Sequence, residues 1–143
     1  MAPSNDAWAR DHGPLTTLDA LAPVINDFSF NGWGGKFDAK KDNEITAGLC
    51  SNNVFGGAIV KQSSFVLEGG AVETDGCGTL LATRSSIIDQ NRNPGLGSAE
   101  IESILSQWLG ITRYLWLDHG ALTGDDTDSH IDTLARFVDP QTI

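Results

Sequence analysis

Glycine and proline interrupt this sequence so often that only short segments of secondary structure fit between them. They cluster at Gly13-Pro14, Gly34-Gly35, Gly56-Gly57, Gly69-Gly70 and Asn93-Pro94-Gly95, and the apolar stretches between these clusters are a few residues long. Glycine and proline are the strongest local breakers of helices and strands. The chain is therefore predicted to contain short strands, tight turns and a few helices.

The expected elements can be placed by apolar pattern. We predict strands at Val24–Phe30, Ser64–Leu67 and Thr79–Thr83, and a hairpin joining residues 72–76 to residues 78–81. A helix is predicted from Ser98, which can cap it, to Gly110, which ends it, because Ile101, Leu105 and Trp108 fall on one face. A buried strand at residues 111–117, a weaker helix at about Lys40–Cys50 and a strand at Ile131–Val138 complete the assignment.

The order of these elements suggests an internal repeat of about fifty residues. One pass of strands, helix and strand ends near Leu67, a second runs from about Val72 to Leu117, and a third begins at His130. Such a period is expected of propeller-like or solenoid architectures. The length of 143 residues is the size of one domain, and residues 1–143 are expected to form it.

Composition excludes several classes of function. Nineteen acidic against nine basic residues give a net charge of -10, which repels phosphate backbones and anionic membranes, so neither nucleic acid nor a membrane is expected as a partner. No run is apolar enough for a transmembrane helix or a signal peptide, which leaves the cytoplasm as the expected location. The two cysteines, Cys50 and Cys77, are expected to be reduced thiols.

The stretch GDDTDSHID surrounds one histidine with carboxylates. In an extended chain Asp126, Asp128, His130 and Asp132 would point to one side, so His130 and Asp132 could face one small ligand. A calcium loop of the EF-hand type is excluded, since its turn glycine and closing glutamate are missing. A metal site that includes His119 stays open as an alternative.

Two further stretches have the composition of site loops. WARDHGP places Asp11 between an arginine and a Gly-Pro turn, and FVLEGG ends an apolar strand with Glu68 followed by two glycines. Reactive groups are often placed at strand ends in α/β proteins. The alternatives are a turn cap or a salt bridge to Arg10 for Asp11, and a solvated hairpin end for Glu68.

Together, WARDHGP, GWGGKF, EGGAVETDG, NRNPGLGSAEIE and GDDTDSHIDTLARF resemble successive motifs of the agmatine deiminase family, which is related to bacterial peptidylarginine deiminases. The resemblance implies an α/β fold, the pentein five-bladed propeller of ββαβ units, of which about two and a half would be present. It also implies hydrolysis of agmatine to N-carbamoylputrescine and ammonia, without metal or organic cofactor.

The resemblance also implies residue roles. Asp11 and Asp132 would hold the guanidinium by paired hydrogen bonds, which suits a planar cation. His130 would be the general acid for departing ammonia and then the base for water, with Glu68 orienting it and raising its basicity. Trp8 would pack against the aliphatic part of the substrate.

Two departures from the family are visible. The family nucleophile is a cysteine far beyond the HxD motif, and neither Cys50 nor Cys77 has its context, so the chain is expected to be a middle segment that does not act alone. Ser129 stands where the family has glycine. A segment that lacks neighbouring blades is expected to self-associate. The competing hypotheses are a module that binds a guanidine or amine without reaction and a metal-dependent hydrolase.

Overall fold

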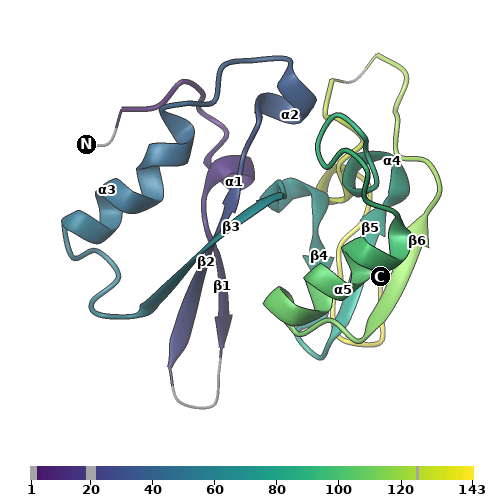
Figure 1. Ribbon diagram of the computed structural model, residues 1–143. Helices are drawn as coiled ribbons and strands as arrows, with labels where there is room; N and C mark the ends of the chain where they lie inside the picture. Colours follow the sequence, from purple (N-terminus) through teal and green to yellow (C-terminus); the bar gives the residue numbers. More distant parts are fainter. Residues whose placement is uncertain (1–2, 19–21, 125) are drawn as a thin grey trace. The chain divides into compact units, whose positions relative to one another are not determined.

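The computed structural model describes residues 3–18, 22–124 and 126–143, and the chain divides into two compact units, Met1–Gly69 and Gly70–Ile143. The strands are β1 (Leu15–Leu18), β2 (Pro23–Ser29), β3 (Ile59–Val66), β4 (Glu73–Thr74), β5 (Thr79–Thr83) and β6 (Arg113–Leu117) (Figure 1). The helices are α1 (Ala9–His12), α2 (Gly32–Gly35), α3 (Ile45–Ser51), α4 (Arg84–Ile87) and α5 (Ser98–Leu109), with 3-10 turns η1 (Asp42–Glu44), η2 (Gly69–Ala71) and η3 (Ile131–Thr133).

Both units have the same strand arrangement. In the first unit β1 pairs antiparallel with β2, which pairs parallel with β3. In the second unit β4 pairs antiparallel with β5, which pairs parallel with β6. A parallel pair needs a crossover connection, and α3 and α5 occupy the two crossovers. The repeated order of elements predicted from the sequence is therefore confirmed, as is the α/β fold class.

The central strand organises the first unit. Residues 24–28 of β2 are all buried, so this strand is covered on both faces. Two of these residues, Asn26 and Asp27, are polar, and Asn26 donates from its side-chain amide to the Thr17 hydroxyl on β1, at 3.0 Å. The neighbouring β3 begins at Ile59, and the segment predicted as a strand, Ser64–Leu67, covers only the end of it. The exposed polar residues 61–64 hide the start of β3 from an apolar pattern.

The second unit is built around β5 and α5. All five residues of β5 are buried, and Ile101 and Leu105 of α5 have no exposed surface. The predicted helix is confirmed, although its N-cap residue is Gly97 and not Ser98, and Gly110 ends it in the left-handed conformation, with φ of 70°. Figure 1 shows α5 lying along the sheet that contains β5 and β6.

One predicted element is wrong. Residues 131–138 do not form a strand: η3 covers Ile131–Thr133, and Thr133 and Arg136 are exposed. The Thr133 hydroxyl donates to the backbone carbonyl of His130 at 2.9 Å, a local bond that favours a turn over a sheet ladder. The β-branched and apolar residues of this segment are typical of a strand, but local hydrogen bonding determines its conformation.

Two aromatic side chains of β6 connect the strand to α5. The Tyr114 hydroxyl donates to the backbone carbonyl of Glu102 at 2.6 Å, and the Trp116 indole N–H donates to the Glu102 carboxylate at 2.8 Å. The two rings are stacked with centroids 6.0 Å apart. Burial raises the pKa of the Tyr114 phenol above its ordinary value of 10.0, and the Glu102 carboxylate adds to this effect.

This contact predicts how the second unit responds to alkali. Because the folded pKa of Tyr114 is raised, its contribution to stability is present below pH 10.0 and is lost as the pH rises through the folded pKa. The chain has a single tyrosine, so phenolate absorbance reports Tyr114 alone. We expect a titration midpoint above 10.0 in the folded protein that returns to 10.0 in urea. A folded titration midpoint at or below 10.0 would contradict the burial of the Tyr114 phenol. The variant Tyr114→Phe, which has no phenol, provides the blank absorbance.

Candidate functional site

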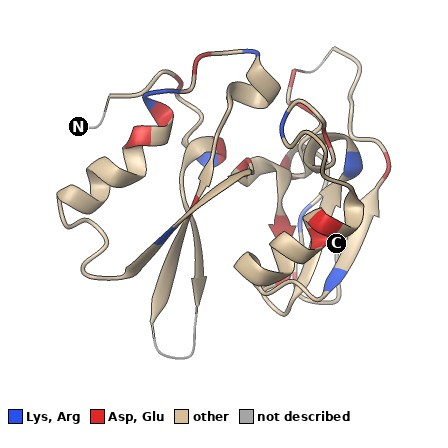
Figure 2. Cartoon of the chain, in the orientation of Figure 1, with Lys and Arg blue, Asp and Glu red and all other residues tan. Residues whose placement is uncertain are grey.

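The side chains singled out from the sequence are distributed over both units. Trp8, Asp11 and Glu68 belong to the first unit, and His130 and Asp132 belong to the second. Acidic residues exceed basic ones in both, eight against five in residues 1–69 and eleven against four in residues 70–143. Figure 2 shows the acidic and basic residues of the described part of the chain along the ribbon. The candidate residues therefore fall into two groups, one in each unit.

Asp11 is a buried carboxylate with a defined hydrogen-bond donor. It lies in the single turn α1 and is 8% exposed. Its Oδ2 accepts a hydrogen bond of 3.0 Å from the indole N–H of Trp33. The Trp33 ring packs edge-on against Phe30, with centroids 4.9 Å apart. The Trp33 indole thus contributes a neutral hydrogen-bond donor to this carboxylate.

Trp33 is a site residue that the sequence reasoning missed. It lies in α2 with a φ of 57°, and Gly32, Gly34 and Gly35 also have positive φ. A bulky residue in the left-handed region is rare and concentrates at functional sites. At Gly32 an added Cβ would come within 2.0 Å of the Phe37 carbonyl oxygen, so the turn requires glycine. The signal in the sequence was a tryptophan among three glycines in GWGGKF.

Glu68 lies beside the loop that carries Asp11. It follows Leu67, which is the first residue after β3, and it is only 1% exposed. A Cβ added to Gly69 would lie 2.0 Å from the backbone carbonyl oxygen of Arg10, so the backbones of the two loops touch at this point. Only glycine allows so close an approach. The EGG and RDxGP stretches are therefore in close backbone contact. Because Glu68 is buried, the alternative that it is a solvated hairpin end is wrong.

Two other side chains of the WARDHGP stretch differ in environment. Trp8 is 66% exposed, which leaves its indole accessible for contact with a ligand. His12 is buried, and among the described residues neither of its ring nitrogens has a hydrogen-bond partner. Its ring lies 5.8 Å from that of Phe30, centroid to centroid. His12 therefore packs as an apolar ring behind Asp11.

In the second unit His130 is buried as predicted, but the chain before it is not extended. His130 is 4% exposed, while Asp128 and Ser129 have φ of 53° and 62°. The strand alternation expected for Asp126, Asp128, His130 and Asp132 is therefore wrong, and Asp125 lies outside the described residues. Glycine at position 129 would adopt this conformation without strain, which serine does not.

Three contacts hold the strained turn. The Thr83 hydroxyl at the end of β5 donates to the Ser129 carbonyl at 2.7 Å. A Cβ on Gly120 would meet that carbonyl oxygen at 2.6 Å, so this backbone also packs against the turn. The buried Arg92 guanidinium places Nη2 3.6 Å from the Asp128 carboxylate and Nη1 3.8 Å from that of Asp89.

The segment after His130 is held by β4. Asp132 is half-buried in η3. Farther on, the Glu73 carboxylate accepts a hydrogen bond from the backbone N–H of Phe137 at 3.1 Å and lies 3.1 Å from Nε of Arg136. His130 and Asp132 are thus carried by a loop that is tied to the sheet on both sides.

The described residues offer few groups for other chemistry. No three His, Cys, Asp or Glu side chains among them gather closely enough to hold a metal ion. Cys50 lies half-buried in α3, and Cys77 is exposed in the turn between β4 and β5. None of the described helices has the length and apolar character needed to cross a membrane.

Comparison with known proteins gives consistent relatives. The family described as Porphyromonas-type peptidyl-arginine deiminase matches residues 1–143. An agmatine deiminase of Stutzerimonas stutzeri is 37% identical over 143 residues, covering 96% of this chain. The structure of a candidate arginine deiminase from Porphyromonas gingivalis is 54% identical with a TM-score of 0.89. That of a C. jejuni agmatine deiminase with substrate bound is 36% identical with a TM-score of 0.90.

The chain is much shorter than these relatives. It spans 38% of the Stutzerimonas stutzeri protein. Of the two solved chains it covers 42% and 41%, while 97% of this chain is matched in each. The likeness therefore extends over nearly all of this chain and over less than half of each relative.

Arg92 provides a test of how the His130 loop is held. We expect Arg92→Met to lower the free energy of unfolding by about 3 kcal/mol, because it removes the buried cation that faces the partly buried carboxylates of Asp89 and Asp128. Hydrogen exchange at the His130 amide, which donates to the Thr127 carbonyl at 3.0 Å, should also become faster. Arg113→Met, at an exposed position, is the matched control and should change stability by less than about 0.5 kcal/mol. Equal urea midpoints for the two variants would contradict the anchoring role.

Proposed function

This chain belongs to the Porphyromonas-type peptidyl-arginine deiminase family, and on that premise we propose that it supplies the substrate-binding and proton-transferring residues of a guanidine-hydrolysing site. Its fold is part of the pentein α/β propeller, and we propose that residues 1–143 form one partial domain of it. The observation that carries the proposal is the burial of Asp11, Glu68 and His130, which are 8%, 1% and 4% exposed. Ionisable groups are seldom buried without a purpose in binding or structure.

In the proposed reaction two carboxylates bind the substrate. Asp11 and Asp132 accept the N–H donors of a planar guanidinium in pairs and offset its charge. The Trp33 indole supports this role by fixing Asp11 from the other side with a hydrogen bond of 3.0 Å. The exposed Trp8 indole is proposed to pack against the aliphatic chain of the substrate. Agmatine is the guanidine we propose, because relatives carry the name agmatine deiminase.

His130 is proposed to move the protons. As a general acid it donates a proton to the departing ammonia, and as a base it then accepts one from the attacking water. Glu68 is proposed to orient the imidazole and to favour its protonated form. The tied loop supports this proposal, since general acid–base catalysis needs a donor held in a fixed geometry.

The nucleophile is proposed to be a cysteine thiolate other than Cys50 and Cys77. Cys50 belongs to α3 and Cys77 to the turn between β4 and β5, and neither stretch is one of the matched motifs. This observation also favours the second candidate function, a module that holds a guanidine or amine without reaction. The two candidates differ in turnover and agree in binding.

Activity of the complete gene product and of the 143-residue chain separates these functions. We expect the complete product to release ammonia from agmatine and the 143-residue chain to release none. In the complete product, Glu68→Gln and His130→Asn should each lower kcat by about 10²–10⁴, the usual contribution of a general acid or base. Asp11→Asn should raise KM as well, since the charged acceptor is lost.

The matched controls are exposed positions of the same residue types. Glu44→Gln and His119→Asn, both at exposed side chains, should leave kcat and KM unchanged. Full activity of His130→Asn, or equal losses in a control, would sink the assignment. Ammonia release by the 143-residue chain would overturn the need for another cysteine.

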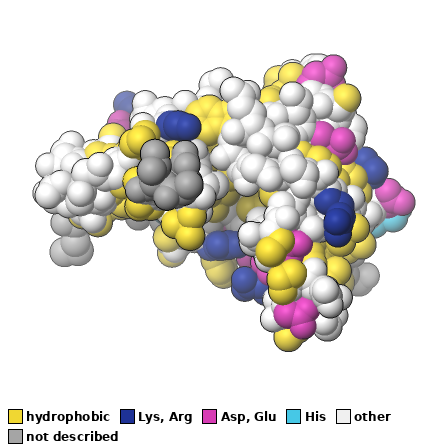
Figure 3. All heavy atoms as spheres, turned by 90° about the horizontal axis from the view of Figure 1, so that it is seen from below, with side chains coloured by type: hydrophobic (Ala, Val, Ile, Leu, Met, Phe, Trp, Pro, Cys, Tyr) yellow, Lys and Arg dark blue, Asp and Glu magenta, His cyan; other side chains and the backbone are white. Residues whose placement is uncertain are grey.

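We also propose that the 143-residue chain self-associates. The last strand in each sheet order, β3 in one unit and β6 in the other, carries apolar side chains at the surface. Ile59 is 56% exposed and Leu117 is 39% exposed, and Figure 3 shows apolar side chains reaching the surface on the face that it presents. Unpaired strand edges with such side chains promote association.

Light scattering tests this association. We expect a mass that rises above that of the monomer with concentration, and Leu117→Lys should weaken the rise because a charge at a strand edge opposes pairing. Lys substitution at the exposed Leu122, outside the strands, is the control. A monodisperse monomer at every concentration would count against the proposal.

A further inference from the structure

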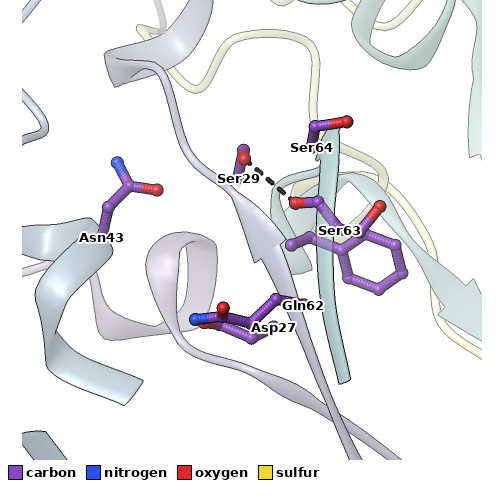
Figure 4. A pocket seen from close by; sticks show the side chains of 7 residues that line it. Asp27, Ser29, Asn43, Gln62, Ser63 and Ser64 are labelled. Carbon is purple, nitrogen blue, oxygen red and sulfur yellow. Dashed lines mark hydrogen bonds between the residues drawn. The ribbon is translucent and has the colours of Figure 1, made fainter. Parts of the chain in front are cut away.

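The first unit contains a cavity of about 330 Å³ between β2, β3 and the 3-10 turn that precedes α3. This volume lies within the range of about 300–1,000 Å³ that is common for small-molecule sites. Its polar lining consists of Asp27, Ser29, Asn43, Gln62, Ser63 and Ser64. Figure 4 shows Asp27 and Gln62 side by side on neighbouring strands, with Asn43 on a separate helical segment. None of these residues belongs to the motifs of the proposed deiminase site.

Asp27 is the charged group of this cavity. It lies in the central strand β2, where it is 9% exposed and faces its register partner Gln62 on β3. The Gln62 amide donates to Asp27 Oδ2 at 3.3 Å, and among the described residues this is the carboxylate's one partner. A buried carboxylate is costly unless a cation or several hydrogen bonds compensate for lost hydration. One long bond from a neutral amide provides little compensation.

Two of the other lining side chains, Ser29 and Asn43, already use their donors in protein hydrogen bonds. The Ser29 hydroxyl donates to the Ser63 carbonyl at 3.0 Å. The Asn43 amide nitrogen donates to the backbone carbonyls of Phe30 and Ala39. Among the described residues, no lysine, arginine or histidine lines the cavity. The wall therefore presents carboxylate, hydroxyl and amide oxygens, which favours a ligand with positive charge and N–H donors and disfavours an anion.

An irregularity in strand pairing opens the sheet at the same place. Phe28 pairs with Ser63, but the next residue, Ser29, pairs with Val66. Ser64 and Phe65 therefore have no partner on β2, and Ser64 is one of the cavity residues. Bulges of this kind recur next to binding sites, where they redirect side chains.

We propose that this cavity binds a small organic cation, with Asp27 as its counter-ion and Gln62 as a second hydrogen-bond acceptor through its carbonyl oxygen. The ligand carries an ammonium or guanidinium group whose N–H donors meet the oxygen-lined wall. The net charge of -10 raises the local concentration of such cations at the surface. The site does not depend on the proposed deiminase function, because it uses different residues.

A titration followed by nitrogen-15 NMR of the 143-residue chain tests the site. The probes are butylammonium, butylguanidinium and tetramethylammonium, the last of which is a cation without N–H donors. We expect saturable shifts at the backbone amides of residues 27–29 and 62–64 with one or both of the first two probes, and weaker shifts with the third. Comparison of butylammonium with butylguanidinium identifies the preferred head group. Shifts confined to residues 8–12 and 68 would mean binding at the deiminase site only and would overturn the proposal.

Asp27→Asn removes the charge and keeps the shape of the side chain. We expect the dissociation constant of the preferred probe to rise about tenfold or more, since hydrogen bonds to a charged group are the strong ones. Asp38→Asn, at an exposed aspartate of the same unit, should bind as the unaltered chain does. Asp11→Asn should also leave the shifts at residues 27–29 intact, which keeps this site distinguishable from the proposed deiminase site.

Stability gives an independent measurement. Without ligand, Asp27→Asn should raise the denaturation midpoint, because a buried charge with one weak partner is removed. Saturating probe should then stabilise the unaltered chain and not the variant. Unchanged binding by Asp27→Asn, or a lower midpoint in the absence of probe, would show that Asp27 is structural and would overturn the proposal.

Discussion

The close backbone contact between Gly69 and Arg10 is the constraint on which the first part of the site depends. It joins the loop after β3 to the loop that contains α1, so that Glu68 and Asp11 come from loops fixed against each other. A side chain at position 69 would occupy the position of the Arg10 carbonyl. Local backbone geometry therefore determines where the buried carboxylates of Asp11 and Glu68 lie, and the apolar core of the unit supports that geometry.

The second unit places His130 in a different way. Here the chain passes through a strained turn at Asp128 and Ser129, and tertiary contacts rather than a rigid strand compensate for the strain. The Thr83 hydroxyl holds the turn at its carbonyl, and Arg92 holds it at the Asp128 carboxylate. A loop fixed at several points can present a reactive imidazole with little freedom, which is what proton transfer requires.

The sequence predicted those parts of the fold in which local pattern and tertiary environment agree. The α5 helix was predicted because Ile101 and Leu105 share its apolar face and Gly110 ends it, although Gly97 rather than Ser98 is its N-cap residue. The segment after His130 was predicted wrongly as a strand, since the preceding left-handed turn has no signature when serine replaces glycine. Trp33 was missed because its role depends on four successive positive φ angles, which bring a distant indole to Asp11. The sequence motifs identified the buried ionisable residues Asp11, Glu68 and His130, and three-dimensional packing determined their partners.

Buried carboxylates in this chain have two kinds of environment, and the difference bears on function. Glu73 combines an arginine at 3.1 Å with a backbone N–H at 3.1 Å, and it ties one segment to another, as a structural charge does. Asp27 has a single neutral partner and faces an open cavity. A protein gains no stability from such a charge, because its hydration is lost and little replaces it. A cation that enters the cavity makes this charge favourable. The free-energy cost of burying Asp27 is therefore best explained by a ligand that would compensate for it.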